Sequence, residues 1–159
     1  MSEDLKKKRR SELLNYDKKQ HSKLLNQQGS VLSDELNSRL RTYSIILIDH
    51  LNWEIRDQYL ELLDKFLEKK IDGFNFRIAF VERYESIEKV ADVLKSNRVL
   101  LSPDENSLDF GDLLSKIDNC CQAYSDDPEP FKNKFEIGDV EFRTLIEKIY
   151  FQMAKYSDK

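Results

Sequence analysis

Glycine and proline are scarce in this sequence, with only four glycines and three prolines in 159 residues. All-β folds need many tight turns, and tight turns depend on these two residues, so their scarcity favours helices. Long apolar runs are also missing, since the longest, Ile45–Ile48, is far too short to cross a bilayer. The first residues contain no apolar stretch of the kind that a secretory signal has. We therefore expect a cytoplasmic location, or the soluble compartment of an organelle.

Cysteine is limited to the adjacent pair Cys120 and Cys121. Neighbouring residues cannot easily adopt disulfide geometry with each other, and the chain has no other cysteine, which indicates a reducing compartment. A reactive thiol needs a basic neighbourhood that stabilises the thiolate, whereas the residues around this pair are acidic. Because one of the two falls on an apolar helical face, we interpret them as core residues.

Patterns that carry catalysis or metal binding are missing as well. The two histidines, His21 and His50, lie far apart, and neither Cys-x-x-Cys nor His-Glu-x-x-His occurs. The glycines are too scattered for a phosphate-binding loop. Acid pairs such as Glu82 and Glu85 arise by chance among thirty acids. The sequence therefore predicts no enzyme, no catalytic residue, no metal site and no cofactor, and it predicts that His50 lies on a helix surface.

The chain does contain enough apolar residues, 40%, for one core and enough charged residues, 35%, for a heavily solvated surface. We divide it into a basic N-terminal arm at residues 1–30 and a helical bundle domain at residues 31–159. The arm is rich in lysine and glutamine, and its leucines form a stripe too thin to bury much. We expect the arm to be disordered alone, or helical when docked.

Apolar residues recur at helical spacing through most of the domain. A first helix is expected behind Ser33 and Asp34. The β-branched stretch Tyr43–Ile48 could form a strand, but no second strand-like segment exists to pair with it. We therefore prefer a helix there, with a break allowed near Thr42–Ser44. The next segment predicts one central helix, because two neighbouring stripes cover more than half of its circumference. These stripes are Leu51, Ile55, Tyr59, Leu62 and Phe66, and Leu60, Leu63, Leu67 and Ile71.

Three further helices are expected beyond a turn at Asp72-Gly73, where glycine would supply the left-handed backbone that ends a helix. Ser102–Glu105 predicts a capping box with Pro103 in the first turn, and Gly138 precedes the last helix. Two prolines and two aspartates at residues 125–130 predict a loop. The predicted fold class is all-α: an antiparallel four- to five-helix bundle with a basic, extended N-terminal arm. The inward positions of the three helices are Phe76, Phe80, Tyr84, Ile87, Ala91 and Leu94; Phe110, Leu113, Leu114, Ile117, Cys121 and Tyr124; and Phe142, Leu145, Ile149, Met153 and Tyr156.

The net charge of −4 conceals an uneven distribution. Residues 1–28 carry eight basic and four acidic side chains, whereas residues 102–141 carry eleven acids and three lysines. Like charges spaced three or four residues apart on one helix face cost a few tenths of a kcal/mol per pair, and a basic partner would offset this cost. A merely solvated face is the alternative. The candidate acidic partner-binding residues are Glu105, Asp109, Asp112, Asp126, Asp127, Glu129, Glu136 and Asp139.

A second candidate surface is the basic run of the arm. Its residues are Lys6, Lys7, Lys8, Arg9 and Arg10, and they are compatible with phosphates or with an anionic protein surface. A solvated tail is the alternative interpretation. No aromatic residue is interleaved with the run, so stacking on single strands is not indicated and direct nucleic-acid binding is not expected.

From residue 51 onward the sequence resembles the colicin-D-type, or bacterial self-protective colicin-like, immunity proteins. The segments that carry the resemblance are Leu62–Leu67, Lys70–Gly73 with Phe76, Asp118–Cys121, Tyr124–Asp127, and Phe135–Asp139 with the closing amphipathic helix. The resemblance implies a small antiparallel helical bundle. It also implies tight binding to a tRNA-cleaving toxin domain, whose basic active site is blocked by acidic side chains. Residues 1–45 have no counterpart in this pattern.

We therefore hold two hypotheses for function, and both concern protein binding. The first is an immunity-like inhibitor that blocks the basic active site of a nuclease toxin with its acidic surface. The alternative is an accessory or structural subunit of a larger assembly, tethered through the basic arm. An enzyme would need a single indispensable residue, and the sequence nominates none.

Overall fold

The computed structural model describes residues 34–96, 104–125 and 136–157. These residues form five α-helices and one short 3₁₀ helix: α3 (Asp34–Glu54), α4 (Arg56–Leu67), α5 (Gly73–Ser96), α6 (Glu105–Ala123), α7 (Asp139–Met153) and η1 (Ala154–Tyr156). The described part contains no β-strand, only an isolated parallel bridge between Tyr124 and Ile137. The all-helical fold class predicted from the sequence is confirmed for these residues.

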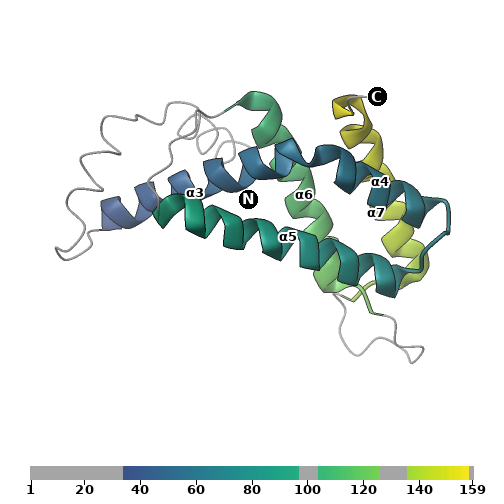
Figure 1. Cartoon of the computed structure of the whole chain (residues 1–159). Helices are drawn as coiled ribbons and strands as arrows, with labels where there is room; N and C mark the ends of the chain where they lie inside the picture. The colour runs from purple at the N-terminus through teal and green to yellow at the C-terminus, as the bar shows by residue number, and fades with distance from the viewer. Residues whose placement is uncertain (1–33, 97–103, 126–135, 158–159) are drawn as a thin grey trace.

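The other helices pack around α5 and α6 (Figure 1). Helix α5 is the longer of these two and runs along most of the described part of the molecule. Helix α3 leads into α4, and α5 returns beside both in the opposite direction. Helix α6 crosses behind α5, and it packs against α3 on one side and α7 on the other. Helix α7 also contacts α4, so the C-terminal helix closes the end of the molecule that is remote from the start of α3.

Aromatic rings fill the main core. Phe66 and Phe76 stack with ring centroids 4.5 Å apart, and Tyr124 and Phe142 stack at the same separation. Ring pairs of this kind add about 0.5–1.5 kcal/mol to the stabilisation from buried area. Most of the predicted inward positions are buried, and the exceptions are half-buried. Those with at most 1% of their surface exposed are Tyr59, Leu63, Phe66, Phe76, Phe80, Ala91, Phe110, Leu114, Ile117, Cys121, Phe142 and Met153.

Helix α3 runs without interruption through the β-branched stretch. The allowed break near Thr42–Ser44 is absent, and the Ser44 hydroxyl donates to the Leu40 carbonyl oxygen at 3.0 Å. Tyr43 and Leu47 are buried against Ala91 of α5, so tertiary packing stabilises this stretch as a helix. The preference for a helix over a strand is therefore confirmed.

The prediction of one helix across residues 51–71 is wrong, because the chain breaks at Ile55 between α3 and α4. The backbone of Ile55 leaves helical geometry at φ −106° and ψ 21°. The Arg56 guanidinium donates to the Trp53 carbonyl oxygen at 2.9 Å and lies 4.1 Å from the centre of the Trp53 ring. It also donates to the Tyr156 carbonyl oxygen at 2.9 Å. Arg56 therefore stabilises the break and joins it to the C-terminal turn.

The end of α4 also differs from the prediction, because the left-handed residue is Lys69, with φ 62°, and not Gly73. The Lys70 amide donates to the Lys65 carbonyl oxygen, and the Lys69 amide donates to that of Phe66. This is the Schellman pattern of hydrogen bonds, which satisfies the last carbonyl groups of a helix. Gly73 instead begins α5, where a Cβ would lie 2.7 Å from the Tyr124 hydroxyl oxygen. Glycine at this position leaves room for the Tyr124 hydroxyl group.

The start of α6 lies beyond the expected capping box. Asp104 is the N-cap, and its carboxylate accepts from the Asn106 amide at 2.7 Å. The prediction that Ser102 caps this helix is therefore wrong, since a carboxylate closer to the first turn takes that role. Helix α7 begins at Asp139 behind Gly138, as predicted. Within the described residues, no helix is both long enough and apolar enough to span a bilayer.

Candidate functional site

Several of the sequence-predicted site residues lie outside the described part of the chain. These are the basic run Lys6, Lys7, Lys8, Arg9 and Arg10, and the acids Asp126, Asp127 and Glu129. The remaining five candidates are Glu105, Asp109 and Asp112 on α6, Glu136 before α7, and Asp139 at its start.

The three candidates on α6 lie on one side of that helix, as their spacing predicts. Glu105 and Asp112 are exposed, whereas Asp109 is half-buried where α6 meets the C-terminal turn. The Tyr156 hydroxyl donates to an Asp109 carboxylate oxygen at 3.4 Å. Asp109 therefore contributes to packing, and Glu105 and Asp112 form the more accessible part of the face.

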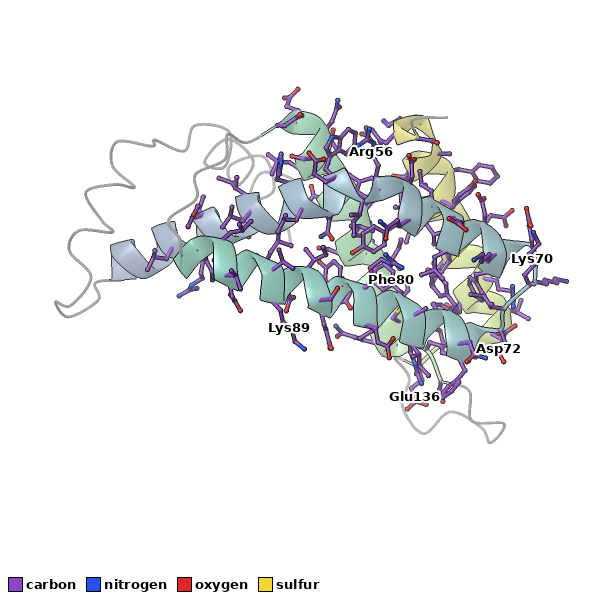
Figure 2. All side chains as sticks on the ribbon, in the orientation of Figure 1. Arg56, Lys70, Asp72, Phe80, Lys89 and Glu136 are labelled. Atoms are coloured by element: carbon purple, nitrogen blue, oxygen red, sulfur yellow. The ribbon has the colours of Figure 1, made fainter. Side chains whose placement is uncertain are left out.

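Glu136 and Asp139 lie at the opposite end of α6. Ile137 pairs with Tyr124, which directly follows α6, so this pair is about 20 Å from Asp109 along the helix axis. Figure 2 shows Glu136 at this end, next to the N-terminal end of α5. The structure therefore does not bring the five described candidates into one cluster.

Asp139 has a structural contact of its own. Its carboxylate accepts from Arg143 at 3.3 Å. Arg143 also donates to the backbone carbonyl oxygens of Phe66 and Ile71, and its guanidinium lies 4.2 Å from the centre of the Phe66 ring. Asp139 thus helps to hold the arginine that joins α7 to the end of α4, which makes it a weaker candidate for partner binding.

Three acids that were not proposed as site residues lie where α5 and α6 meet. The pKa of the Asp118 carboxyl is raised, first because partial burial disfavours the carboxylate and then because the nearby Glu85 carboxylate repels it, while a hydrogen bond from Gln122 opposes the shift. The Tyr84 pKa is also raised, chiefly by burial and further by Asp118, Asp49 and Glu88. Glu85 of α5 therefore lies near Asp118 of α6, and Glu88 and Asp118 both act on Tyr84.

The contact between α5 and α6 connects this group to the predicted α6 face. The hydroxyls of Tyr84 and Ser115 lie 3.4 Å apart. Asp112 precedes Ser115 by three residues on the exposed side of α6, and Asp118 follows it by three. We define the acidic band as Glu85, Glu88, Glu105, Asp112 and Asp118. Residues 104–125 contain only one basic side chain, Lys116, beside five acids, so the band has little positive charge on its own helix.

The sequence could not have assigned Glu85 and Glu88 to this surface. Both carry the ordinary signal of an exposed helical position, and the nearness of Glu85 to Asp118 depends on how α5 crosses α6. A search for acids that alternate with the apolar stripe of α5 would have listed them without linking them to α6.

The described residues offer little for metal or thiol chemistry. They contain no group of three or more potential metal-ligating side chains. His50 lies on the surface of α3, with its Nε2 3.4 Å from a Glu54 carboxylate oxygen. Burial raises the pKa of the Cys121 thiol to about 12, with further contributions from Asp118 and Cys120, and burial also raises that of Cys120. The protonated thiols are therefore poor nucleophiles at neutral pH.

Comparisons with family models, with curated proteins and with solved structures find no match to this chain.

Proposed function

We propose that this protein is a binding module without catalytic function, an immunity-like inhibitor that covers the basic active site of a tRNA-cleaving nuclease with the acidic band. The observation that carries the proposal is that Glu85 of α5 lies near Asp118 of α6, where the two helices contact each other through Tyr84 and Ser115. Carboxylates carry negative charge, as nucleic-acid phosphates do. A group of them can therefore occupy a basic cleft that binds phosphates.

The electrostatics support a partner over a merely solvated surface. Burial is the main cause of the raised pKa of Asp118, and the Glu85 carboxylate raises it further. The two carboxylates therefore repel each other in the isolated chain. A lysine or arginine of a partner would remove this repulsion on binding. Complementary charge also accelerates association and lowers affinity for like-charged surfaces.

The resemblance to the colicin-D-type immunity proteins supplies the class of partner. It rests on segments of α4, α6 and α7 and on the turn before α5. The same proposal includes the arrangement of the chain: the five helices form an antiparallel bundle, and residues 1–30 form a separate basic arm. The residues of α6 then form the centre of the interface.

The test is inhibition of tRNA cleavage in a native extract that contains the nuclease. Purified full-length protein should lower the cleavage rate, and this inhibition should weaken as salt is added, because salt screens exposed charges. A triple variant, Glu88→Gln, Asp112→Asn and Asp118→Asn, should inhibit at least tenfold less well at equal concentration, which corresponds to about 1.4 kcal/mol of binding free energy.

A matched variant controls for the loss of three charges. Glu61→Gln, Glu141→Gln and Glu147→Gln remove the same charge from exposed positions on α4 and α7, away from the band, and should leave inhibition unchanged. Equal inhibition by the two variants would contradict the acidic band as the binding surface. An absence of inhibition by the wild-type protein in an extract with active nuclease would contradict the proposed function itself.

A further inference from the structure

The outward side of α7 carries the two most exposed large apolar side chains among the described residues. Val140 is 81% exposed and Phe151 is 69% exposed. Helix α7 packs against α4, α5 and α6 (Figure 1), and the residues that it buries are Phe142, Ile146, Ile149 and Met153. One exposed apolar side chain on a surface is ordinary, so the question is whether these two belong to a common pattern.

The two side chains belong to one stripe along the helix. The exposed residues Val140, Thr144, Glu147 and Phe151 follow spacings of four, three and four. This spacing keeps side chains on one side of a helix, where they can contact a second helix along its length. The buried residues of α7 repeat the same spacing two positions further along, so the exposed stripe lies on the opposite side. We define these four exposed residues as the outer α7 stripe.

The outer α7 stripe is complementary to itself in the reverse direction. Around a centre between Thr144 and Glu147, an antiparallel second α7 places Phe151 of that copy against Val140 at both ends. In the middle, each Glu147 carboxylate meets a Thr144 hydroxyl, which can turn its proton away from the Val140 carbonyl oxygen and donate to the carboxylate. A parallel pair would instead place Glu147 against Glu147, and like charges in a contact are unfavourable.

The charges beside the stripe favour the same antiparallel order. Glu141 and Lys148 are exposed on one flank of the outer α7 stripe. Neither forms an ion pair with a described residue, and neither has an opposite charge three or four residues away on α7. In an antiparallel pair these flanks meet, and Glu141 lies within about 3 Å, along the helix axis, of Lys148 of the second copy. With Glu147 and Lys155, the outward side has two acids and two lysines, so two copies do not repel each other.

We propose that two copies of this chain associate through their outer α7 stripes, in antiparallel order, with a Glu141–Lys148 ion pair on each side of the centre. The second copy is identified as the occupant by charge complementarity and by the reversed order of the same four residues. The stripe is about 17 Å long, so the contact is at the small end of protein interfaces and the dimer is reversible.

This contact does not depend on the proposed function. It uses only α7, whereas the acidic band lies on α5 and α6. Variants that weaken the dimer should therefore still inhibit the nuclease as the wild-type protein does. The dimer is measured on the purified protein without a nuclease, so the failure of one proposal leaves the other standing.

Sedimentation equilibrium of the purified full-length protein tests the proposal. Between about 10 µM and 1 mM, the average mass of the wild-type protein should rise from one chain toward two. Phe151→Ala should raise the dissociation constant at least tenfold. Phe74→Ala removes an aromatic ring that is 41% exposed on α5 and should leave the dissociation constant unchanged. Circular dichroism of both variants checks that the helices are retained.

A charge exchange tests the antiparallel order. Glu141→Lys or Lys148→Glu alone should raise the dissociation constant at least tenfold, because each places like charges at both flanks of the dimer. An equimolar mixture of the two variants should associate as tightly as the wild-type protein, because each position 141 then meets an opposite charge at position 148.

Three results would overturn the proposal. A wild-type protein that stays at the mass of one chain over the whole concentration range excludes the dimer. A dimer that Phe151→Ala leaves unchanged uses a different surface. Weakening by the two charge variants without recovery in their mixture excludes the antiparallel order.

Discussion

Replacing Asp118 by asparagine should stabilise the folded protein at neutral pH. Asp118 is half-buried on α6, and its pKa is raised by burial and by the Glu85 carboxylate. The folded state therefore favours the protonated carboxyl, and at pH 7 it holds an ionised group in an unfavourable place. Asparagine has nearly the same shape, carries no charge, and keeps an oxygen that can accept the hydrogen bond from Gln122.

The pH dependence follows from the direction of the shift. The pKa of Asp118 is higher in the folded chain than in the unfolded chain, where it is about 3.9. Protonation therefore contributes stability that is fully present below pH 3.9 and is lost as the pH rises through the folded value. Because solvent screens a half-exposed group, we expect Asp118→Asn to gain between about 0.2 and 1 kcal/mol at pH 7 and close to nothing at pH 3.

Urea unfolding followed by circular dichroism measures this difference. The midpoint for Asp118→Asn should exceed that of the wild type at pH 7, and the two midpoints should converge at pH 3. Glu147→Gln, at an exposed position on α7, should have a much smaller effect and serves as the control. A lower midpoint for Asp118→Asn at pH 7, or a gain that grows on acidification, would refute the reasoning. The same substitution belongs to the triple variant that should weaken inhibition, so stability and binding are expected to change in opposite directions.

Three further substitutions test the packing, each by the midpoint of urea unfolding. Lys69→Gly should stabilise the protein by about 1 kcal/mol, because glycine adopts the left-handed backbone without the strain that lysine has there. Tyr59→Phe should cost about 1–3 kcal/mol, because the Tyr59 hydroxyl donates at 2.7 Å to the buried Asn52 side chain, whose amide nitrogen already has no partner within the described residues. Gly111→Ala should cost about 1–3 kcal/mol, because a Cβ there would overlap the Asp49 carboxylate, and Asp49→Ala in the same chain should recover part of that loss.

The apolar faces of the helices could be predicted from sequence because burial follows the 3.6-residue period. Five predicted inward residues of α6, from Phe110 to Cys121, and Tyr124 directly after the helix are all buried. The helix over Tyr43–Ile48 was also predictable, since the alternative strand had no partner. The first prediction needs only the local spacing of apolar residues. The second needs only a search of the whole sequence for another strand-like segment.

The break at Ile55 could not be predicted because the apolar stripe continues across it. Leu51 and Tyr59 both face inward, as they would in one straight helix. What ends α3 is the set of contacts that Arg56 makes with Trp53 and with the distant Tyr156. A periodic pattern reports which side of a helix is apolar, and it does not report where a tertiary contact interrupts the backbone.

The turn after α4 shows a related limit. Glycine tolerates left-handed backbone better than any other residue, so the sequence favoured Gly73 for that role. The structure places the left-handed residue at Lys69 and uses Gly73 for its small size against Tyr124. The two uses of glycine leave the same mark in a sequence, and only the packing partner distinguishes them.

The acidic surface required tertiary structure for the same reason. A linear count assigned the acidity to residues 102–141, yet Glu85, whose carboxylate helps to raise the pKa of Asp118, lies on a different helix from Asp118. Repulsion between two carboxylates is screened less when one of them is half-buried. Such a pair therefore costs stability, and solvation of the surface alone does not offset this cost. The proposed nuclease supplies the missing positive charge. Its lysines and arginines would remove the repulsion between Glu85 and Asp118 on binding, so the pair that is unfavourable in the isolated chain becomes favourable in the complex.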